Sequence, residues 1–181
     1  MSLRVTTGKV RLCFPHLFEP YAYDPEDEPK YSAQLLIPKS DRETLEKLRK
    51  AEAEAATEAK AWGGKAPKSW TSIISDGDQA DLERFPEREG NWVMSVNANK
   101  KFAPQVVDRN VQAILDQTEV YSGVYARVSV TAFTFDFNGK KGVGFALGNV
   151  QILGGGSNLG GGAPASADFD EVEGDDGDDL I

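Results

Sequence analysis

The sequence has very few residues that could build a metal site or a disulfide, with one cysteine, Cys13, and one histidine, His16, among 181 residues. A single cysteine cannot form a disulfide within the chain, and this pair cannot supply the ligands of a structural zinc site. Hydrophobic runs of the ~20 residues that span a membrane are also missing, and the first residues lack the apolar core of a signal peptide. We therefore expect an intracellular protein with no metal, no cofactor and no membrane anchor.

An excess of positive charge is missing too, because the formal net charge is −9. The charge is unevenly distributed along the chain. Residues 1–162 carry 20 basic and 21 acidic side chains, whereas residues 163–181 carry eight acidic side chains and no basic one. A nearly neutral body can still present a basic surface on one side, so the net charge does not exclude a nucleic-acid ligand.

Alternation of apolar and polar residues predicts several strands. In the clearest one, at 124–137, Val124 and every second residue after it form a small aliphatic face, and Tyr125 and every second residue after it form an aromatic and polar face. Asn138-Gly139 then predicts a hairpin turn. The other strands are predicted at residues 3–14, 31–37, 91–97 and 142–153.

One amphipathic helix is predicted between the second and third strands. It begins at Ser40, which fits a capping box with Glu43, and runs to about Trp62, where two glycines end it. Five strands, one helix and long loops, including the Pro-rich residues 15–29, are typical of a small barrel. We predict a mainly β fold, an OB-like five-stranded β-barrel.

Three segments are predicted along the chain. The barrel covers residues 1–153, a Gly-rich linker covers residues 154–162, and an acidic tail covers residues 163–181. The tail has few large apolar residues and many like charges, so it cannot repay the entropy of folding and is predicted to be disordered.

The aromatic face of the strand at 124–137 is the best candidate for a binding surface. Exposed aromatic rings are costly in water without a partner, and stacking on nucleic-acid bases contributes about 1–3 kcal/mol per base. Nearby lysine and arginine side chains would neutralise phosphates. An alternative is that these rings form a second small core under the helix. The predicted DNA-binding residues are Tyr125, Arg127, Phe133, Phe135, Phe137, Lys100, Lys101, Phe102, Arg109, Lys140, Lys141, Lys9, Arg11 and Trp92.

The last residues of the tail form a second candidate site. Asp175, Asp176, Asp178 and Asp179 precede an apolar pair, Leu180 and Ile181. Acidic residues that end in an apolar pair suit a short peptide that docks into a basic pocket with an apolar floor on a partner protein. The same polyanion could fold back onto a basic surface of its own chain and compete with DNA. Simple solvation of the acidic residues is the alternative.

Several short motifs resemble a known family, the phage single-stranded-DNA-binding proteins first catalogued as a domain of unknown function. They are Ala103-Pro104-Gln105-Val106-Val107-Asp108, Tyr121-Ser122-Gly123-Val124-Tyr125-Ala126-Arg127, Lys141-Gly142-Val143-Gly144 and Gly148-Asn149-Val150-Gln151. The resemblance implies an OB fold and binding of single-stranded DNA without marked sequence preference. It also implies a role in phage replication or recombination in the cytoplasm of a bacterial host.

The tail is separately similar to the acidic C-termini through which bacterial and phage single-stranded-DNA-binding proteins recruit replication enzymes. Those tails usually end in Phe, whereas this one ends in Leu180-Ile181.

No residue pattern in the sequence supplies a catalytic site, so we predict a protein without enzymatic activity. It would coat and protect single-stranded DNA and recruit replication or recombination proteins through its tail. One alternative is a phage scaffold or protein-interaction module that does not bind DNA. Another is a metal-dependent DNA-processing enzyme with Asp24, Glu26 and Asp27 as ligands. The sequence leaves open whether the protein is a monomer or a homo-oligomer.

Overall fold

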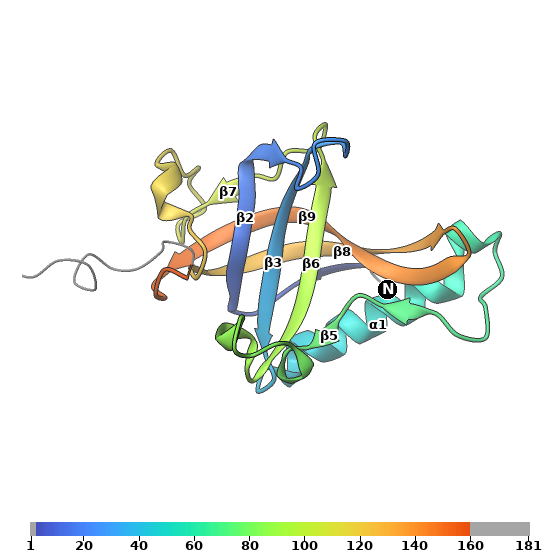
Figure 1. Cartoon of the computed structure of the whole chain (residues 1–181). Coiled ribbons are helices and arrows are strands. Elements are labelled where there is room, and N and C mark those ends of the chain that lie inside the picture. Colours follow the sequence, from blue (N-terminus) through green and yellow to red (C-terminus); the bar gives the residue numbers. More distant parts are fainter. Residues whose placement is uncertain (1–2, 160–181) are drawn as a thin grey trace, which may run out of the picture.

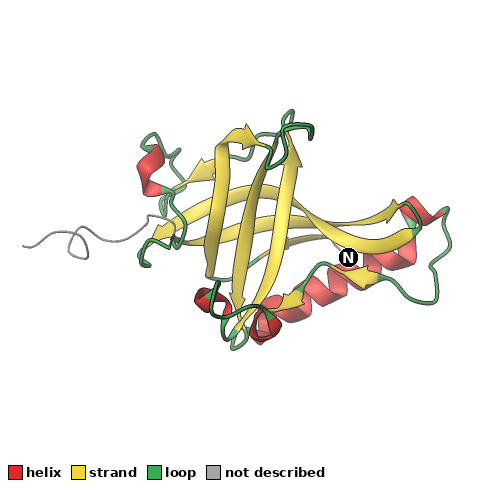
Figure 2. Ribbon diagram, viewed as in Figure 1, coloured by secondary structure: helices red, strands yellow, loops and turns green. Residues whose placement is uncertain are grey.

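The computed structural model describes residues 3–159, so the acidic tail and the last residues of the predicted linker lie outside the described residues. Figure 1 labels the elements, and Figure 2 shows that strands dominate. The long strands are β2 (Val10–Tyr21), β3 (Lys30–Pro38), β6 (Asn91–Asn99), β8 (Tyr125–Phe137) and β9 (Lys140–Gly154). The short strands are β1 (Arg4–Thr6), β4 (Thr71–Ser72), β5 (Ser75–Asp76) and β7 (Val106–Val107). The helical elements are α1 (Arg42–Glu58) and the 3-10 turns η1 (Lys60–Trp62), η2 (Gly77–Gln79), η3 (Pro86–Arg88) and η4 (Gln117–Glu119).

The five long strands close into a ring in the order β2, β3, β6, β9, β8 and back to β2. In Figure 1, β2, β3 and β6 run side by side at the front, and β8 and β9 cross behind them. Two seams of the ring are short, because β6 pairs with β9 only at Asn97 and β2 pairs with β8 at two positions. A partly open five-stranded barrel is the OB architecture. The prediction of a mainly β, OB-like barrel is confirmed, with the short strands added at its edges.

The interior of the barrel comes from one face of each long strand. Val124, just before β8, and Ala126, Val128 and Val130 of β8 form the predicted aliphatic face and are fully buried. They meet the alternating apolar residues of β3 and β6, such as Leu35 and Met94. The hairpin after β8 turns at Asn138 and Gly139, which both have positive φ, as the predicted tight turn requires.

The first predicted strand is wrong in its boundaries. Residues 3–14 form β1 and the beginning of β2, and β2 then continues through Pro15 and Pro20, where we expected a loop, as far as Tyr21. The prolines are tolerated because the register between β2 and β3 shifts between Cys13 and His16 and again before Tyr21. Proline is accepted at such bulges because a bulged residue does not need to donate to the ladder.

The helix also differs from its prediction at both ends. Its N-cap is Asp41 rather than Ser40, since the Asp41 carboxylate accepts the Thr44 N–H at 3.1 Å. Its C-cap is Ala59, which adopts a left-handed conformation, so Trp62 lies in η1 beyond the helix. The Trp62 ring is buried, and its indole N–H donates to the Phe135 carbonyl oxygen at 2.9 Å. The predicted apolar stripe therefore does pack on the sheet, although the helix ends earlier.

Residues 155–159, at the start of the predicted linker, are attached to the barrel. The Tyr121 hydroxyl donates to the Gly155 carbonyl oxygen at 2.7 Å, and the Leu159 N–H donates to the Ser122 carbonyl oxygen at 2.7 Å. Within residues 3–159, no helix is long and apolar enough to cross a membrane. The described residues therefore end beside the loop that precedes β8.

Candidate nucleic-acid interface

The phenylalanines predicted on β8 lie on a hairpin arm. Figure 1 shows the far ends of β8 and β9 extending beyond the barrel, with α1 beneath them. Phe133 and Phe137 are 43% and 72% exposed, whereas Phe135 is half-buried. The Phe135 ring lies over Gly142, and the Phe133 ring over Gly144 on the facing strand. The arm also carries Lys140 and Lys141.

Tyr125, Lys9 and Arg11 are brought together at the other end of β8. The Lys9 ammonium lies 4.4 Å from the centroid of the Tyr125 ring, and the Arg11 guanidinium carbon lies 5.7 Å from it. Arg11 also donates to the Gly123 carbonyl oxygen at 2.9 Å and to Ser157 at 2.8 Å. Arg11 therefore already holds the loop before β8 against the end of β9.

The remaining predicted residues are dispersed. Lys100 lies in the turn after β6, 3.4 Å from the Glu28 carboxylate, and Phe102 in the same turn is 72% exposed. Arg109 donates to the Leu153 carbonyl oxygen at 2.8 Å, and Arg127 donates to the Thr7 carbonyl oxygen at 3.2 Å. Lys101, next to Lys100, is exposed.

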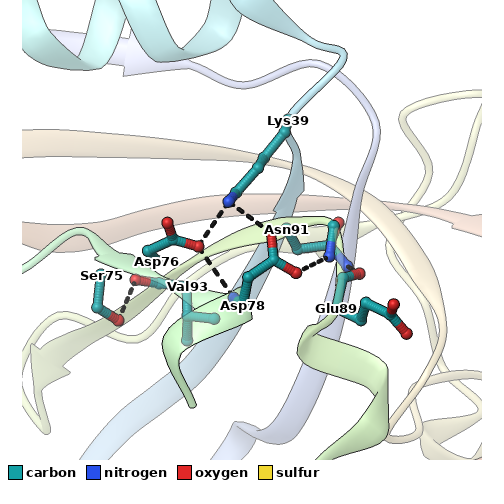
Figure 3. Close-up of polar contacts among 8 residues, drawn as sticks. Lys39, Ser75, Asp76, Asp78, Glu89, Asn91 and Val93 are labelled. Atoms are coloured by element: carbon teal, nitrogen blue, oxygen red, sulfur yellow. Dashed lines mark hydrogen bonds and ion pairs between the residues drawn. The ribbon is translucent and has the colours of Figure 1, made fainter. Parts of the chain in front are cut away.

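Trp92 lies on the inward face of β6, where two cationic side chains cover its ring. The Lys39 ammonium is 4.8 Å and the Arg49 guanidinium carbon 6.0 Å from the ring centroid. Figure 3 shows Lys39 bound between Asp76 and Asp78, at 2.5 and 2.6 Å. Hydrogen bonds from this ammonium lower the pKa of both carboxyls, and the two carboxylates raise the pKa of Lys39. The cluster thus ties β3 to η2 beneath Trp92.

The predicted residues therefore do not form one surface. The structure separates most of them into three groups, which are the hairpin arm, the group around Tyr125, and the turn at 100–102. Arg109 lies near the second group, because it binds the Leu153 carbonyl oxygen and the next residue, Gly154, pairs with Tyr125. Trp92, on the inward face of β6, lies apart from these groups.

A different cluster of aromatic side chains lies on the outer face of β2 and the loop after it. The His16 and Tyr21 rings stack with centroids 4.3 Å apart and planes within 7°. Tyr23 meets the Tyr21 ring edge-on at 4.8 Å. Tyr21 and Tyr23 are 46% and 71% exposed, and Phe14, on the same strand, is 43% exposed. We call Phe14, His16, Tyr21 and Tyr23 the aromatic edge.

The aromatic edge borders a hollow of about 570 Å³ whose lining comes from β2, β3, β6 and the loop between β2 and β3. The outward residues of β3 and β6 form its polar floor, because Ser32 pairs with Asn97 and Gln34 pairs with Ser95. The side chains of these four residues can donate and accept hydrogen bonds without carrying charge. We call this hollow the aromatic groove.

The bulge in β2 produces the aromatic edge. Phe14 has a φ of 49°, a conformation that costs a non-glycine residue free energy. Its N–H donates to the Ser122 hydroxyl at 3.1 Å instead of joining the ladder with β3. A strained residue that the surrounding structure holds in place is a frequent feature of functional sites.

Charge around the aromatic groove is mixed. Lys30 lines it from β3, while Asp27 and Glu28 line it from the loop before β3. Burial lowers the pKa of His16, so its ring is neutral at pH 7 and stacks as an uncharged plane on Tyr21. The groove is therefore suited to flat, uncharged rings at its edge and to hydrogen-bonding groups at its floor.

The sequence did contain a signal for this edge. His16, Tyr21 and Tyr23 lie within eight residues of one another, between Pro15 and Pro25. We interpreted that segment as a loop because of its prolines. With Phe18, four ring-bearing residues lie in this short segment, and such a density of rings indicates a surface with a ligand rather than a solvated connection.

Neither the acidic loop nor the cysteine forms a reactive site. The Asp24 carboxylate accepts the Glu26 N–H at 3.0 Å and shapes a turn. Within residues 3–159, no group of three or more His, Cys, Asp or Glu side chains could hold a metal ion. Cys13 is buried, and burial raises the pKa of its thiol to about 11, so it is protonated at neutral pH.

Comparisons with known proteins identify the family of the chain. A family model described as Enterobacter phage Enc34, ssDNA-binding protein, matches residues 3–181. A putative protein, p50, of Acyrthosiphon pisum secondary endosymbiont phage 1 is 33% identical over 181 residues, and the match covers 94% of both chains.

Solved structures show the same fold. The single-stranded DNA-binding protein from bacteriophage Enc34 in complex with ssDNA has a TM-score of 0.72 and 25% identity, over 87% of this chain and 89% of that chain. The same Enc34 protein without DNA has a TM-score of 0.69 and 25% identity, over 92% and 90%. Bacteriophage T7 gp2.5, a single-stranded DNA-binding protein, has a TM-score of 0.64 over 96% and 98%, and its 17% identity supports the fold alone.

This family consists of DNA-binding proteins rather than enzymes, in agreement with the prediction of a protein without catalytic activity. The match over nearly the whole chain establishes that the protein belongs to the Enterobacter phage Enc34 ssDNA-binding protein family.

Proposed function

We propose that the protein binds single-stranded DNA and that the aromatic groove holds its unpaired bases. The observation that carries this proposal is the gathering of three exposed rings, Phe14, Tyr21 and Tyr23, at one border of a polar hollow. Each base has a flat face that stacks on an aromatic ring whatever its identity. The family of this chain, and the complex that the Enc34 protein forms with ssDNA, support single-stranded DNA as the ligand.

The cationic side chains near the groove would hold the phosphates. Lys30 lines the groove, Lys100 and Lys101 follow at the end of β6, and Lys9 and Arg11 flank Tyr125 near the start of β2. Such contacts release counterions, so the affinity falls as salt increases. The arm with Phe133, Phe135, Phe137, Lys140 and Lys141 remains a second proposed contact for DNA, as do Arg127, Arg109 and Phe102. Trp92 is withdrawn from the proposed contacts, because Lys39 and Arg49 cover its ring.

The biological role that we propose is the protection of single strands in phage replication or recombination, in the cytoplasm of a bacterial host. The acidic tail would recruit proteins of these processes through Asp175, Asp176, Asp178, Asp179, Leu180 and Ile181, which lie outside the described residues.

Binding of DNA itself is tested with fluorescein-labelled dT oligomers and a matched duplex, by fluorescence anisotropy at two salt concentrations. We expect the single strand to bind at low salt and to weaken as salt increases. A protein that leaves the dT oligomer unbound at low salt would overturn the proposed function.

The position of the site is tested with Tyr21→Ala and Tyr23→Ala, with Phe137→Ala for the hairpin arm and with Leu115→Ala, an exposed apolar residue outside both proposed contacts, as the control. Loss of one stacking ring should weaken binding of dT about 5- to 150-fold, whereas Leu115→Ala should bind as the wild type does. If Phe137→Ala weakens binding and the tyrosine variants do not, the hairpin arm is the binding surface.

A further inference from the structure

A second hollow, of about 740 Å³, lies between β1, α1 and β8. We call it the β1–α1 groove and define it by Arg4, Val5, Lys47, Lys50, Ala53 and Arg127. It shares no lining residue with the aromatic groove. Arg4 lies on the exposed side of β1, Lys47 and Lys50 lie one helical turn apart on α1, and Arg127 lies on the outward face of β8.

The lining of this groove combines positive charge with an apolar floor. Four of its side chains are cationic, and within the described residues Glu54 is the one acidic side chain that lines it. Lys47 also pairs with Glu43 at 3.3 Å. Val5, Ala53 and the aliphatic stems of the two lysines supply apolar surface. The lining residues that the structure describes include no aromatic side chain, so the groove is not built to stack bases.

We propose that the end of the chain's own acidic tail, residues 175–181, docks in the β1–α1 groove. The charges are complementary, since Asp175, Asp176, Asp178 and Asp179 would face the four cations. Leu180 and Ile181 would cover the apolar floor. The groove thus has the two properties that this tail requires of a docking site.

The length and the starting point of the tail permit this docking. The Leu159 N–H is bonded to Ser122, and Arg127 lies five residues further along the chain, a distance of roughly 17 Å in an extended strand. The 22 residues from 160 to 181 can span up to about 70 Å. A tethered peptide also has a high effective concentration, on the order of millimolar for short linkers, which favours it over a free partner.

Docking would have two consequences. It covers Leu180 and Ile181 while no partner is present. It also leaves the aromatic groove open, so that DNA can be bound there while the tail is docked, with Arg127 then paired with the tail and not with DNA. A tail that competes directly for the DNA site would not allow this. The proposal does not require DNA binding, because the groove and the tail belong to the same chain.

The test is carbodiimide cross-linking of the full-length protein, which joins lysine ammonium groups to carboxylates in contact, followed by mass spectrometry of the peptides. We expect cross-links from Lys47 and Lys50 to residues 175–181, and none from Lys65 and Lys68, which are also exposed. Leu180→Ser with Ile181→Ser, which leaves every charge in place, should reduce these cross-links several-fold. High salt should reduce them as well.

Two results would overturn the proposal. One is cross-linking of the tail to Lys30 or Lys100 with Lys47 and Lys50 unmodified, which would place the tail beside the aromatic groove. The other is loss of the Lys47 and Lys50 cross-links when a dT oligomer is added, which would assign the β1–α1 groove to DNA. Cross-links that persist with dT bound support separate sites.

Discussion

Phe14 is a residue at which backbone strain and the proposed DNA contact coincide. Its left-handed conformation costs an L-residue about 1–2 kcal/mol. Glycine adopts the same conformation without this cost. We therefore expect Phe14→Gly to unfold at higher urea than Phe14→Ala, by about 1 kcal/mol in the free energy of unfolding, although both lose the ring. Both variants should bind dT more weakly than the wild type. Equal stability of the two variants would show that φ at this position relaxes without cost.

Lys39 makes the stability of the protein depend on pH in the acid range. The pKa values of Asp76 and Asp78 are lowered mainly by hydrogen bonds from the Lys39 ammonium. A carboxyl whose pKa is lower in the folded state stabilises the fold above its ordinary pKa, near pH 4, and loses that contribution as the pH falls through the lowered value. Lys39→Met should therefore lower the urea midpoint at pH 6 and flatten its decline below pH 4. Tryptophan fluorescence, to which Trp92 beside Lys39 contributes, can follow the unfolding. An unchanged acid profile would contradict this role.

The strands differ in how far local sequence determined them. The alternation in β8 and the Asn138-Gly139 turn depend on the residues themselves, and both were predicted from the sequence. The continuation of β2 through Pro15 and Pro20 depends on bulges opposite β3, which local sequence does not encode. The aromatic edge was therefore missed, because Tyr21 reaches it only if β2 continues.

Packing around Gly123, in the loop before β8, leaves no room for a side chain at this position. Its φ is 112°, and a Cβ atom there would overlap the Ser157 carbonyl oxygen. Gly123→Ala should therefore detach residues 155–159 and reduce the free energy of unfolding by more than the ~1 kcal/mol of left-handed strain alone. Gly63→Ala is the matched control, because Gly63 also has positive φ but has no atom within 4 Å of such a Cβ. Urea unfolding measures both, and an equal loss would mean that Ser157 can move aside.

The predicted binding residues were scattered because the whole molecule decides which outward faces adjoin one another. Tyr125 and Phe133 share one face of β8, yet Tyr125 meets Lys9 near the seam with β2, while Phe133 lies on the arm beyond the barrel. Strand periodicity indicates on which side a residue points, but it does not indicate which strand lies beside it. The family was nevertheless recognisable, because its motifs are continuous in sequence.

The separation of charge between body and tail gives a prediction for the whole molecule. The eight acidic residues of the tail carry most of the net charge of −9 and repel DNA whether or not the tail is docked. Replacing these eight residues with Asn and Gln keeps the length of the tail and removes its charge. This variant should bind a dT oligomer more tightly than the wild type at low salt, with the difference shrinking near 1 M salt, where the screening length falls to about 3 Å. Anisotropy titrations at several salt concentrations measure the effect. If the neutral tail leaves the affinity unchanged at low salt, the charge of the tail has no influence on DNA binding, and its acidic residues would serve docking or partner proteins instead.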